Sequence, residues 1–124
     1  MVDSETQSRI EELSSKLYRD ANIDYIQFWL LLASVRQKFP DKSDEEKSAI
    51  TISIVKKLVR LGLLVFNFCK TAETTWSKHV WKDQDPDSVG ARIAREWAAL
   101  PGDPGLGDIC WLMLPCPEGE AGNA

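Results

Sequence analysis

The sequence predicts an α+β fold with a helical, winged-helix-like N-terminal half, a small antiparallel sheet and a fourth helix. Three observations lead to this prediction. Apolar residues recur at helical spacing in three successive stretches of the first half. Two short strand-like segments separated by a polar turn then follow, as in a hairpin. Finally, a fourth helical stretch precedes one more short apolar segment, which we expect to join the sheet.

Cap and stop signals place the first two helices. Ser4 is expected to cap a helix over residues 5–19, which has one narrow apolar stripe and is otherwise charged. Asn22 or Asp24 is expected to open a second helix, whose wider stripe predicts a central place in the core. Pro40 ends that helix, because proline has no backbone N–H and clashes with the preceding turn.

A capping box marks the start of the third helix, over residues 44–61. Ser43 can accept a hydrogen bond from the Glu46 amide, and the Glu46 carboxylate can reach back to the Ser43 amide. Gly62 follows as a residue that readily adopts positive φ, the conformation that commonly ends a helix.

The second half of the chain supplies the predicted sheet. Residues 63–68 and 78–82 predict the two strands of a hairpin. A turn at residues 83–88 leads into the fourth helix, which a loop rich in Pro and Gly ends at residues 101–107. Residues 109–114 predict the last strand, which we expect beside the hairpin.

Five tryptophans are a high number for a chain of this length. Trp29 and Trp97 lie on the apolar stripes of predicted helices, so we expect both in the core. Trp81 flanks the hairpin and has two interpretations. It is either an exposed aromatic anchor for a partner, or it packs over the sheet with its indole N–H bonded to a backbone carbonyl.

Composition predicts one globular domain over residues 1–115 and a disordered tail over 116–124. The 124 residues are 44% hydrophobic and 27% charged, as in an ordinary folded domain. The acidic N-terminal residues predict no signal peptide, and no apolar run reaches the about 18 residues of a membrane span. An odd cysteine count favours reduced thiols, so we expect a cytoplasmic location.

Catalytic motifs are missing from the sequence. His79 is the single histidine, and it has no carboxylate or cysteine at a spacing typical of catalytic sites. No serine lies in a Gly-x-Ser-x-Gly turn, and neither nucleotide-binding glycine motif is present. Cys110 and Cys116 have no second pair with which to form a zinc site. We therefore expect no enzyme, no cofactor and no metal.

Charge is unevenly distributed along a chain of net charge −4. Residues 47–82 carry seven Lys or Arg and one acid, and in a winged helix this region docks on DNA. However, residues 44–46 are acids at the helix N-terminus that would enter the groove, where they would repel phosphate. The basic segment could instead pair with acids of the same fold or contact a protein.

Acidic loops around the fourth helix are the predicted partner-binding surface. The candidate residues are Asp83, Asp85, Asp87, Asp103 and Asp108, with Trp81 as the aromatic anchor. Such a surface could steer the chain onto a basic partner such as a nuclease. The alternative is that these acids only cap turns and helices locally.

The C-terminal third resembles the close of small bacterial immunity proteins. The resemblance lies in a helix ending Arg-Ile-Ala-Arg-Glu-Trp at residues 92–97, a Pro-Gly loop, and Gly-Asp-Ile-Cys-Trp-Leu at 107–112. Residues 54–64 are similar to the central helix–turn–strand of those proteins. The resemblance implies a non-catalytic cytoplasmic inhibitor that occludes one cognate toxin domain, as in contact-dependent growth inhibition. It carries over no functional residue.

Two other functions are compatible with the sequence. One is a winged-helix regulator that binds nucleic acid through the basic segment, although the acidic chain makes nucleic acid an unfavoured partner. The other is a small adaptor subunit of a larger complex.

Overall fold

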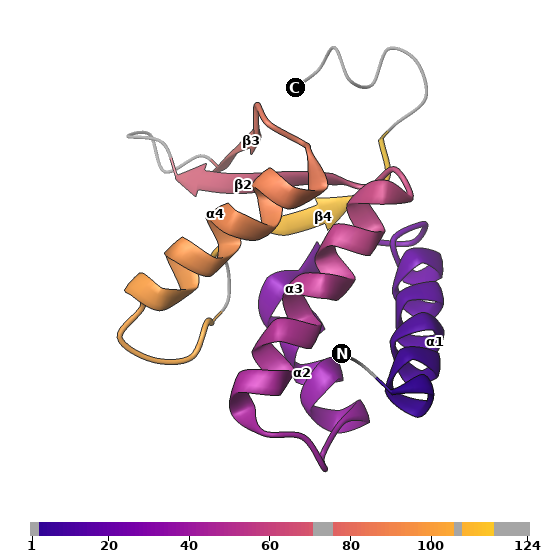
Figure 1. The fold of residues 1–124 in the computed structure, drawn as a ribbon. Coiled ribbons are helices and arrows are strands. Elements are labelled where there is room, and N and C mark those ends of the chain that lie inside the picture. The colour runs from indigo at the N-terminus through magenta and orange to yellow at the C-terminus, as the bar shows by residue number, and fades with distance from the viewer. Residues whose placement is uncertain (1–2, 71–75, 106–107, 116–124) are drawn as a thin grey trace.

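The structure is a computed structural model and describes residues 3–70, 76–105 and 108–115, without the side chains of residues 69, 70 and 76. Its elements follow in the order α1 (Ser4–Asp20), β1 (Ile26–Gln27), α2 (Phe28–Lys38), α3 (Asp44–Arg60), β2 (Leu64–Lys70), β3 (Trp76–Val80), α4 (Pro86–Ala99) and β4 (Trp111–Met113). The α+β prediction, with its helical first half, small antiparallel sheet and fourth helix, is confirmed (Figure 1). The predicted tail over residues 116–124 lies outside the described residues.

The sheet joins the two halves of the chain. Its strands lie in the order β1-β4-β2-β3, and all neighbouring pairs are antiparallel. The predicted hairpin is therefore present as β2 and β3, and the C-terminal strand β4 lies between it and β1 from the first half. The three N-terminal helices lie on one side of the sheet, below it in Figure 1.

Local signals set the ends of α3 as predicted. The Ser43 hydroxyl accepts from the Glu46 amide at 3.1 Å, and the Glu46 carboxylate accepts from the Ser43 amide at 3.0 Å. Gly62 has a φ of +109°, which a side chain would strain. The predicted cap of α1 is wrong by one residue, because Asp3 accepts from the Thr6 amide at 2.7 Å and Ser4 is already helical.

The start of α2 differs from the prediction. Residues 26 and 27 form β1, which pairs with β4, so the helix begins at Phe28 rather than after Asn22 or Asp24. Gln27 is its N-cap residue and makes no side-chain cap hydrogen bond. Pairing with a strand distant in the sequence has overridden the local cap signals.

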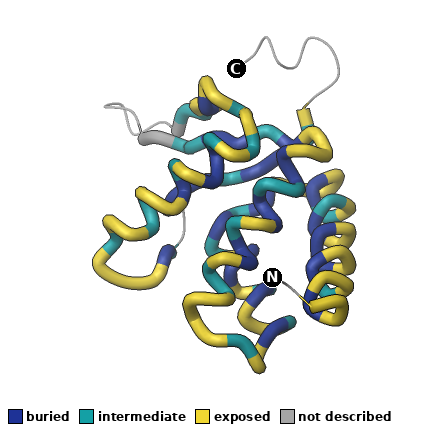
Figure 2. The backbone as a smooth tube through the Cα atoms, in the orientation of Figure 1, coloured by how far each residue is buried: buried dark blue, intermediate teal, exposed yellow. Residues whose placement is uncertain are grey.

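The core lies between the helices and the sheet, as the buried segments in Figure 2 show. The side chains of Phe28, Ile54 and Leu112 are fully buried in it. Helix α4 packs along α3 so closely that a Cβ on Gly90 would lie 2.9 Å from Lys56 Cδ. Among the helices in the described ranges, none is long and apolar enough to cross a membrane.

Two predicted core tryptophans lie at the margin of the core. Trp97 is half-buried and packs edge-on against Phe28, with 5.1 Å between ring centroids. Trp29 is also half-buried, and its indole N–H donates to Gln27 Oε1 at 2.8 Å. Trp97 packs against the core cluster as a partly buried residue, so its predicted place in the core is confirmed in that form. The core prediction is wrong for Trp29, which is not part of that cluster.

Candidate protein-binding surfaces

The predicted acidic surface consists of residues that each have a partner within the fold. Asp85 is the N-cap of α4 and accepts from the Ser88 amide at 3.1 Å. Asp83 in turn accepts from the Asp85 amide at 3.0 Å. Asp108 accepts from the Gly105 amide at 2.8 Å. These three carboxylates stabilise turns and a helix start, as the alternative interpretation expected.

The other two acids form ion pairs within the fold. Asp87 lies 2.9 Å from Lys56 Nζ, and Asp103 lies 2.8 Å from Arg36. The five predicted acids also lie at opposite ends of α4, a helix of 14 residues that spans about 21 Å. Three precede or begin the helix, and the other two follow it. The five acids therefore belong to two separate groups, and whether either group binds a partner stays a prediction.

These ion pairs predict how stability depends on pH. The hydrogen bond from Lys56 lowers the pKa of Asp87 below its usual value of 3.8, and the hydrogen bond from Arg36 does the same for Asp103. A carboxyl with a lowered pKa stabilises the fold at higher pH and loses that contribution as pH falls through the folded value. Urea unfolding should show stability falling below about pH 3.8, and less steeply in the variant Asp87→Asn/Asp103→Asn. An unchanged slope in that variant would contradict these pairs.

Trp81 is not available as an exposed anchor. Only 4% of the residue is exposed, and its indole N–H donates to Asn67 Oδ1 at 2.6 Å. The Arg92 guanidinium lies over the ring, 3.8 Å from its centroid. Packing over the sheet is the correct interpretation, although the acceptor is a side-chain amide and not a backbone carbonyl.

Two polar side chains that sequence analysis missed hold this region together. Asn67 Nδ2 donates to the carbonyl of Ile109, a residue with an unusual φ of 69°. Gln84 accepts from the Val65 amide and donates to the Val65 carbonyl, both at 2.9 Å. The Gln84 side chain thus pairs with β2 much as a strand residue would.

The basic segment is partly neutralised inside the fold. Lys56 pairs with Asp87, and Lys57 Nζ lies 3.3 Å from the Glu11 carboxylate. Lys78 Nζ lies 5.9 Å from the centroid of the Phe66 ring. Helix α3, which carries several of these residues, contacts α1, α2 and α4. Pairing with acids of the same fold is therefore correct for Lys56 and Lys57 of α3.

The reactive side chains of the described residues are not brought together. His79 is exposed on β3. Cys110 is buried, and that burial raises the pKa of its thiol, which disfavours the nucleophilic thiolate. No group of three or more His, Cys, Asp or Glu in the described ranges could hold a metal ion.

The outer side of the sheet, opposite the helices, is rich in aromatic residues. Strand alternation turns Val65 and Leu112 toward the core and their neighbours Phe66 and Trp111 away from it. We define the aromatic face as five residues from the strands and the loop before β1: Tyr25, Phe66, Phe68, Val80 and Trp111. Ring centroids within it lie 5.0 to 6.3 Å apart, from Phe68–Trp111 to Tyr25–Trp111.

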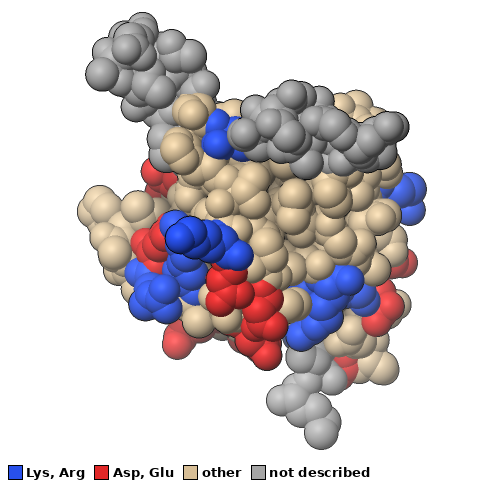
Figure 3. Space-filling view, turned by 90° about the horizontal axis from the view of Figure 1, so that it is seen from above, with Lys and Arg blue, Asp and Glu red and all other residues tan. Residues whose placement is uncertain are grey.

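Part of the aromatic face is open to solvent. Tyr25 and Val80 are exposed, and Phe68 and Trp111 are half-buried. Seen from this side, most of the visible surface is uncharged and most charged residues gather at its margins (Figure 3). One cation lies on the face itself, because Lys78 pairs with Phe68 across the hairpin and its Nζ lies near the Phe66 ring. The Trp111 indole N–H is buried and has no hydrogen-bond partner within the described part of the chain. An apolar centre with a charged margin is the usual anatomy of a protein interface.

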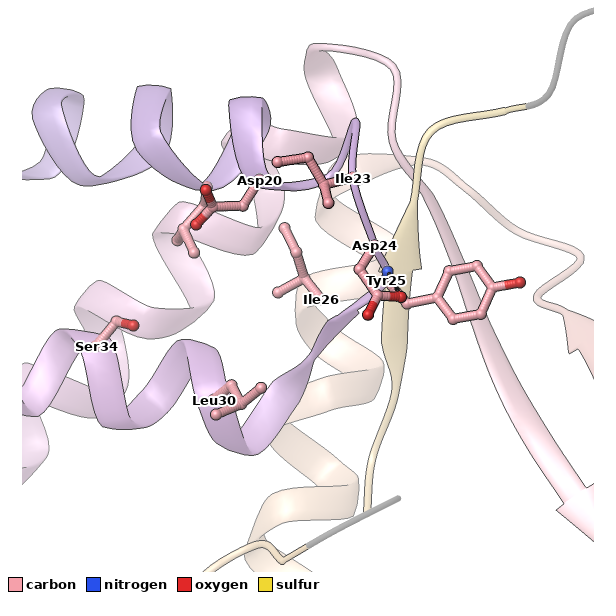
Figure 4. A pocket seen from close by; sticks show the side chains of 8 residues that line it. Asp20, Ile23, Asp24, Tyr25, Ile26, Leu30 and Ser34 are labelled. Carbon is pink, nitrogen blue, oxygen red and sulfur yellow. Dashed lines mark hydrogen bonds between the residues drawn. The ribbon is translucent and has the colours of Figure 1, made fainter.

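A groove between α1 and α2 opens beside the aromatic face. Its cavity of about 410 Å³ lies between the end of α1 and the start of α2 (Figure 4). Ile23 and Leu30 line it from opposite sides, and Asp20 and Asp24 lie at its rim. The Tyr25 ring points away from the cavity, toward the sheet. We call this hollow the α1–α2 groove.

Sequence analysis missed both of these surfaces. The signal for the aromatic face was present, because residues 64–66 are apolar on both sides of a strand, which is typical of a strand covered on both sides. Comparisons of the chain with protein-family models, with curated proteins and with solved structures find no match.

Proposed function

We propose that this chain is a non-catalytic protein-binding inhibitor, an immunity protein that neutralises a cognate bacterial toxin domain by covering its active or substrate-binding site. The observation that carries the proposal is the aromatic face. A cytoplasmic location, where the inhibitor would meet an incoming toxin, is part of the same proposal.

The chemistry of the aromatic face favours a protein partner. Tyrosine and tryptophan are enriched among the residues that contribute most to protein binding, and Tyr25 and Trp111 lie side by side on this face. Its largely uncharged extent suits the apolar centre of an interface.

The class of partner follows from the resemblance to immunity proteins. The exposed acids near α4 pair with residues of α3 and α2 on the helical side of the sheet, so they would act at a distance and mainly change the association rate. Asp87 and Asp103 retain 79% and 70% side-chain exposure despite their ion pairs. A toxin with a basic cleft, such as a nuclease, would be attracted by them.

Nucleic-acid binding is the less favoured function. In a winged helix the third helix enters the DNA groove, so its outer face must be open. Here α4 packs along α3, and Asp87 of α4 pairs with Lys56 of α3. Both features reduce the basic surface that α3 could offer to phosphates.

Growth rescue tests the proposal. The product of the gene directly upstream should arrest growth when its C-terminal domain is produced alone, and co-production of this chain should restore growth. The two proteins should also purify together as a stable complex. A neighbouring domain that is not toxic, or one whose toxicity this chain leaves unchanged without binding it, would contradict the proposal.

A further inference from the structure

We infer that the α1–α2 groove receives a short segment of a protein partner that carries an apolar side chain with a lysine or arginine beside it. This inference deepens the proposed function, because it assigns a second contact and its chemistry to the same partner. It depends on three features of the groove.

The first feature is the apolar lining. Ile23 is 86% exposed and Leu30 is 43% exposed, and both border the one cavity into which Ile26 also projects. A single exposed aliphatic residue needs no explanation, but two that face a common cavity form a place where an apolar side chain can bury. The volume of about 410 Å³ is enough for a side chain and part of its backbone.

The second feature is the position of the two rim acids. Asp20 is the last residue of α1, where the helix dipole is negative and a carboxylate is disfavoured. Asp24 has the residue type of a helix cap, but α2 begins four residues later and the Asp24 carboxylate accepts from the adjacent Tyr25 amide. In the described part of the chain, Asp20 has one side-chain partner, Lys16 on the same helix, and the Asp24 carboxylate bonds only the adjacent amide. Because a carboxylate can accept several hydrogen bonds, both groups can still accept from a bound segment.

The third feature is the charge of the groove. Two of its eight lining residues are acidic and none is basic. Lys16 does pair with Asp20 at 2.9 Å, but both side chains are about half exposed, and such pairs contribute little and exchange readily. With the negative end of α1 beside them, Asp20 and Asp24 favour a cation on the bound segment over a neutral or acidic one.

A second hollow extends the groove along the same two helices. It is lined by residues of both helices, and Ser34 borders both hollows. The bound segment can therefore continue between α1 and α2 beyond its first apolar side chain. This extent favours a peptide segment over an isolated side chain as the occupant.

Selection from a random 12-residue peptide library, displayed on phage and applied to the full chain, tests the inference. Peptides that are enriched on the wild type and are not retained by the variant Ile23→Ser/Leu30→Ser should share an apolar residue with Lys or Arg within four positions. The variant Asp20→Asn/Asp24→Asn should bind the consensus peptide at least tenfold more weakly. A matched control, Glu5→Gln/Glu45→Gln, removes two exposed charges elsewhere and should leave binding unchanged.

Three results would overturn the inference. The first is that no peptide is enriched more on the wild type than on the Ile23→Ser/Leu30→Ser variant. The second is a consensus sequence without Lys or Arg. The third is a wild-type dimer in solution that this variant converts to a monomer, because the occupant would then be a second copy of the chain. Each result is independent of growth rescue, so it would leave the proposed function standing.

Discussion

Replacing Trp81 with alanine is expected to lower the free energy of unfolding by about 3–5 kcal/mol, the usual loss for a buried tryptophan. The side chain is almost fully buried, and its removal would leave Asn67 Oδ1 without its donor and Arg92 without the ring beneath it. For a domain of this size the melting temperature should fall by more than about 12 °C.

Trp29→Ala is the matched control for this prediction. Trp29 is half-buried at the margin of the core, so its loss should cost clearly less than the loss of Trp81. Thermal unfolding followed by circular dichroism measures both variants. If Trp81→Ala kept the wild-type melting temperature but lost its partner, Trp81 would be the exposed anchor that the sequence first suggested.

Placing a charge on the aromatic face is expected to abolish most partner binding. Val80 is 38% exposed on the edge strand β3, so Val80→Glu should leave the melting temperature nearly unchanged. In a complex, the same glutamate would be moved from water into an apolar contact, which is strongly unfavourable. We expect binding of the toxin domain at least about 100-fold weaker, equivalent to about 2.7 kcal/mol.

Leu61→Glu provides the control for that variant. Leu61 is 48% exposed at the end of α3, outside both the aromatic face and the α1–α2 groove. The Leu61→Glu variant also replaces an exposed aliphatic side chain with glutamate, and its exposure is similar. Its affinity for the toxin domain should remain within about twofold of wild type. Calorimetric titration of both variants decides the matter, and equal losses would show that overall charge, rather than the aromatic face, controls binding.

The parts of the fold that sequence predicted best are those set by local chemistry. The capping box at Ser43 and the positive φ of Gly62 depend on neighbouring residues only, and both are confirmed. The start of α2 depends on the pairing of Ile26 with Leu112, and no local signal reveals a partner so distant in the sequence. The same limit explains why Trp81 had two open interpretations, since Asn67 is brought to it only by the sheet.

The candidate surfaces show the same division. The sequence shows that aspartates flank α4 but not what they contact. The partners of Asp87 and Asp103, Lys56 and Arg36, belong to other helices, so sequence could not distinguish an ion-paired carboxylate from a free one. The two-sided apolar character of β2 was visible in the residues. The topology decides which side of the sheet the helices cover. It therefore also decides where the aromatic face lies, and the sequence does not reveal this.

Hydroxyl-radical footprinting of the chain, alone and in complex with its toxin domain, tests the central claim most directly. Aromatic side chains are read individually, so the contact surface can be located residue by residue. We predict that oxidation of Tyr25 and Trp111 falls at least fivefold in the complex, while oxidation of Tyr18 and Trp97, which lie outside the aromatic face, changes little. Unchanged oxidation of Tyr25 and Trp111 in a saturated complex would contradict this prediction and place the partner on another surface.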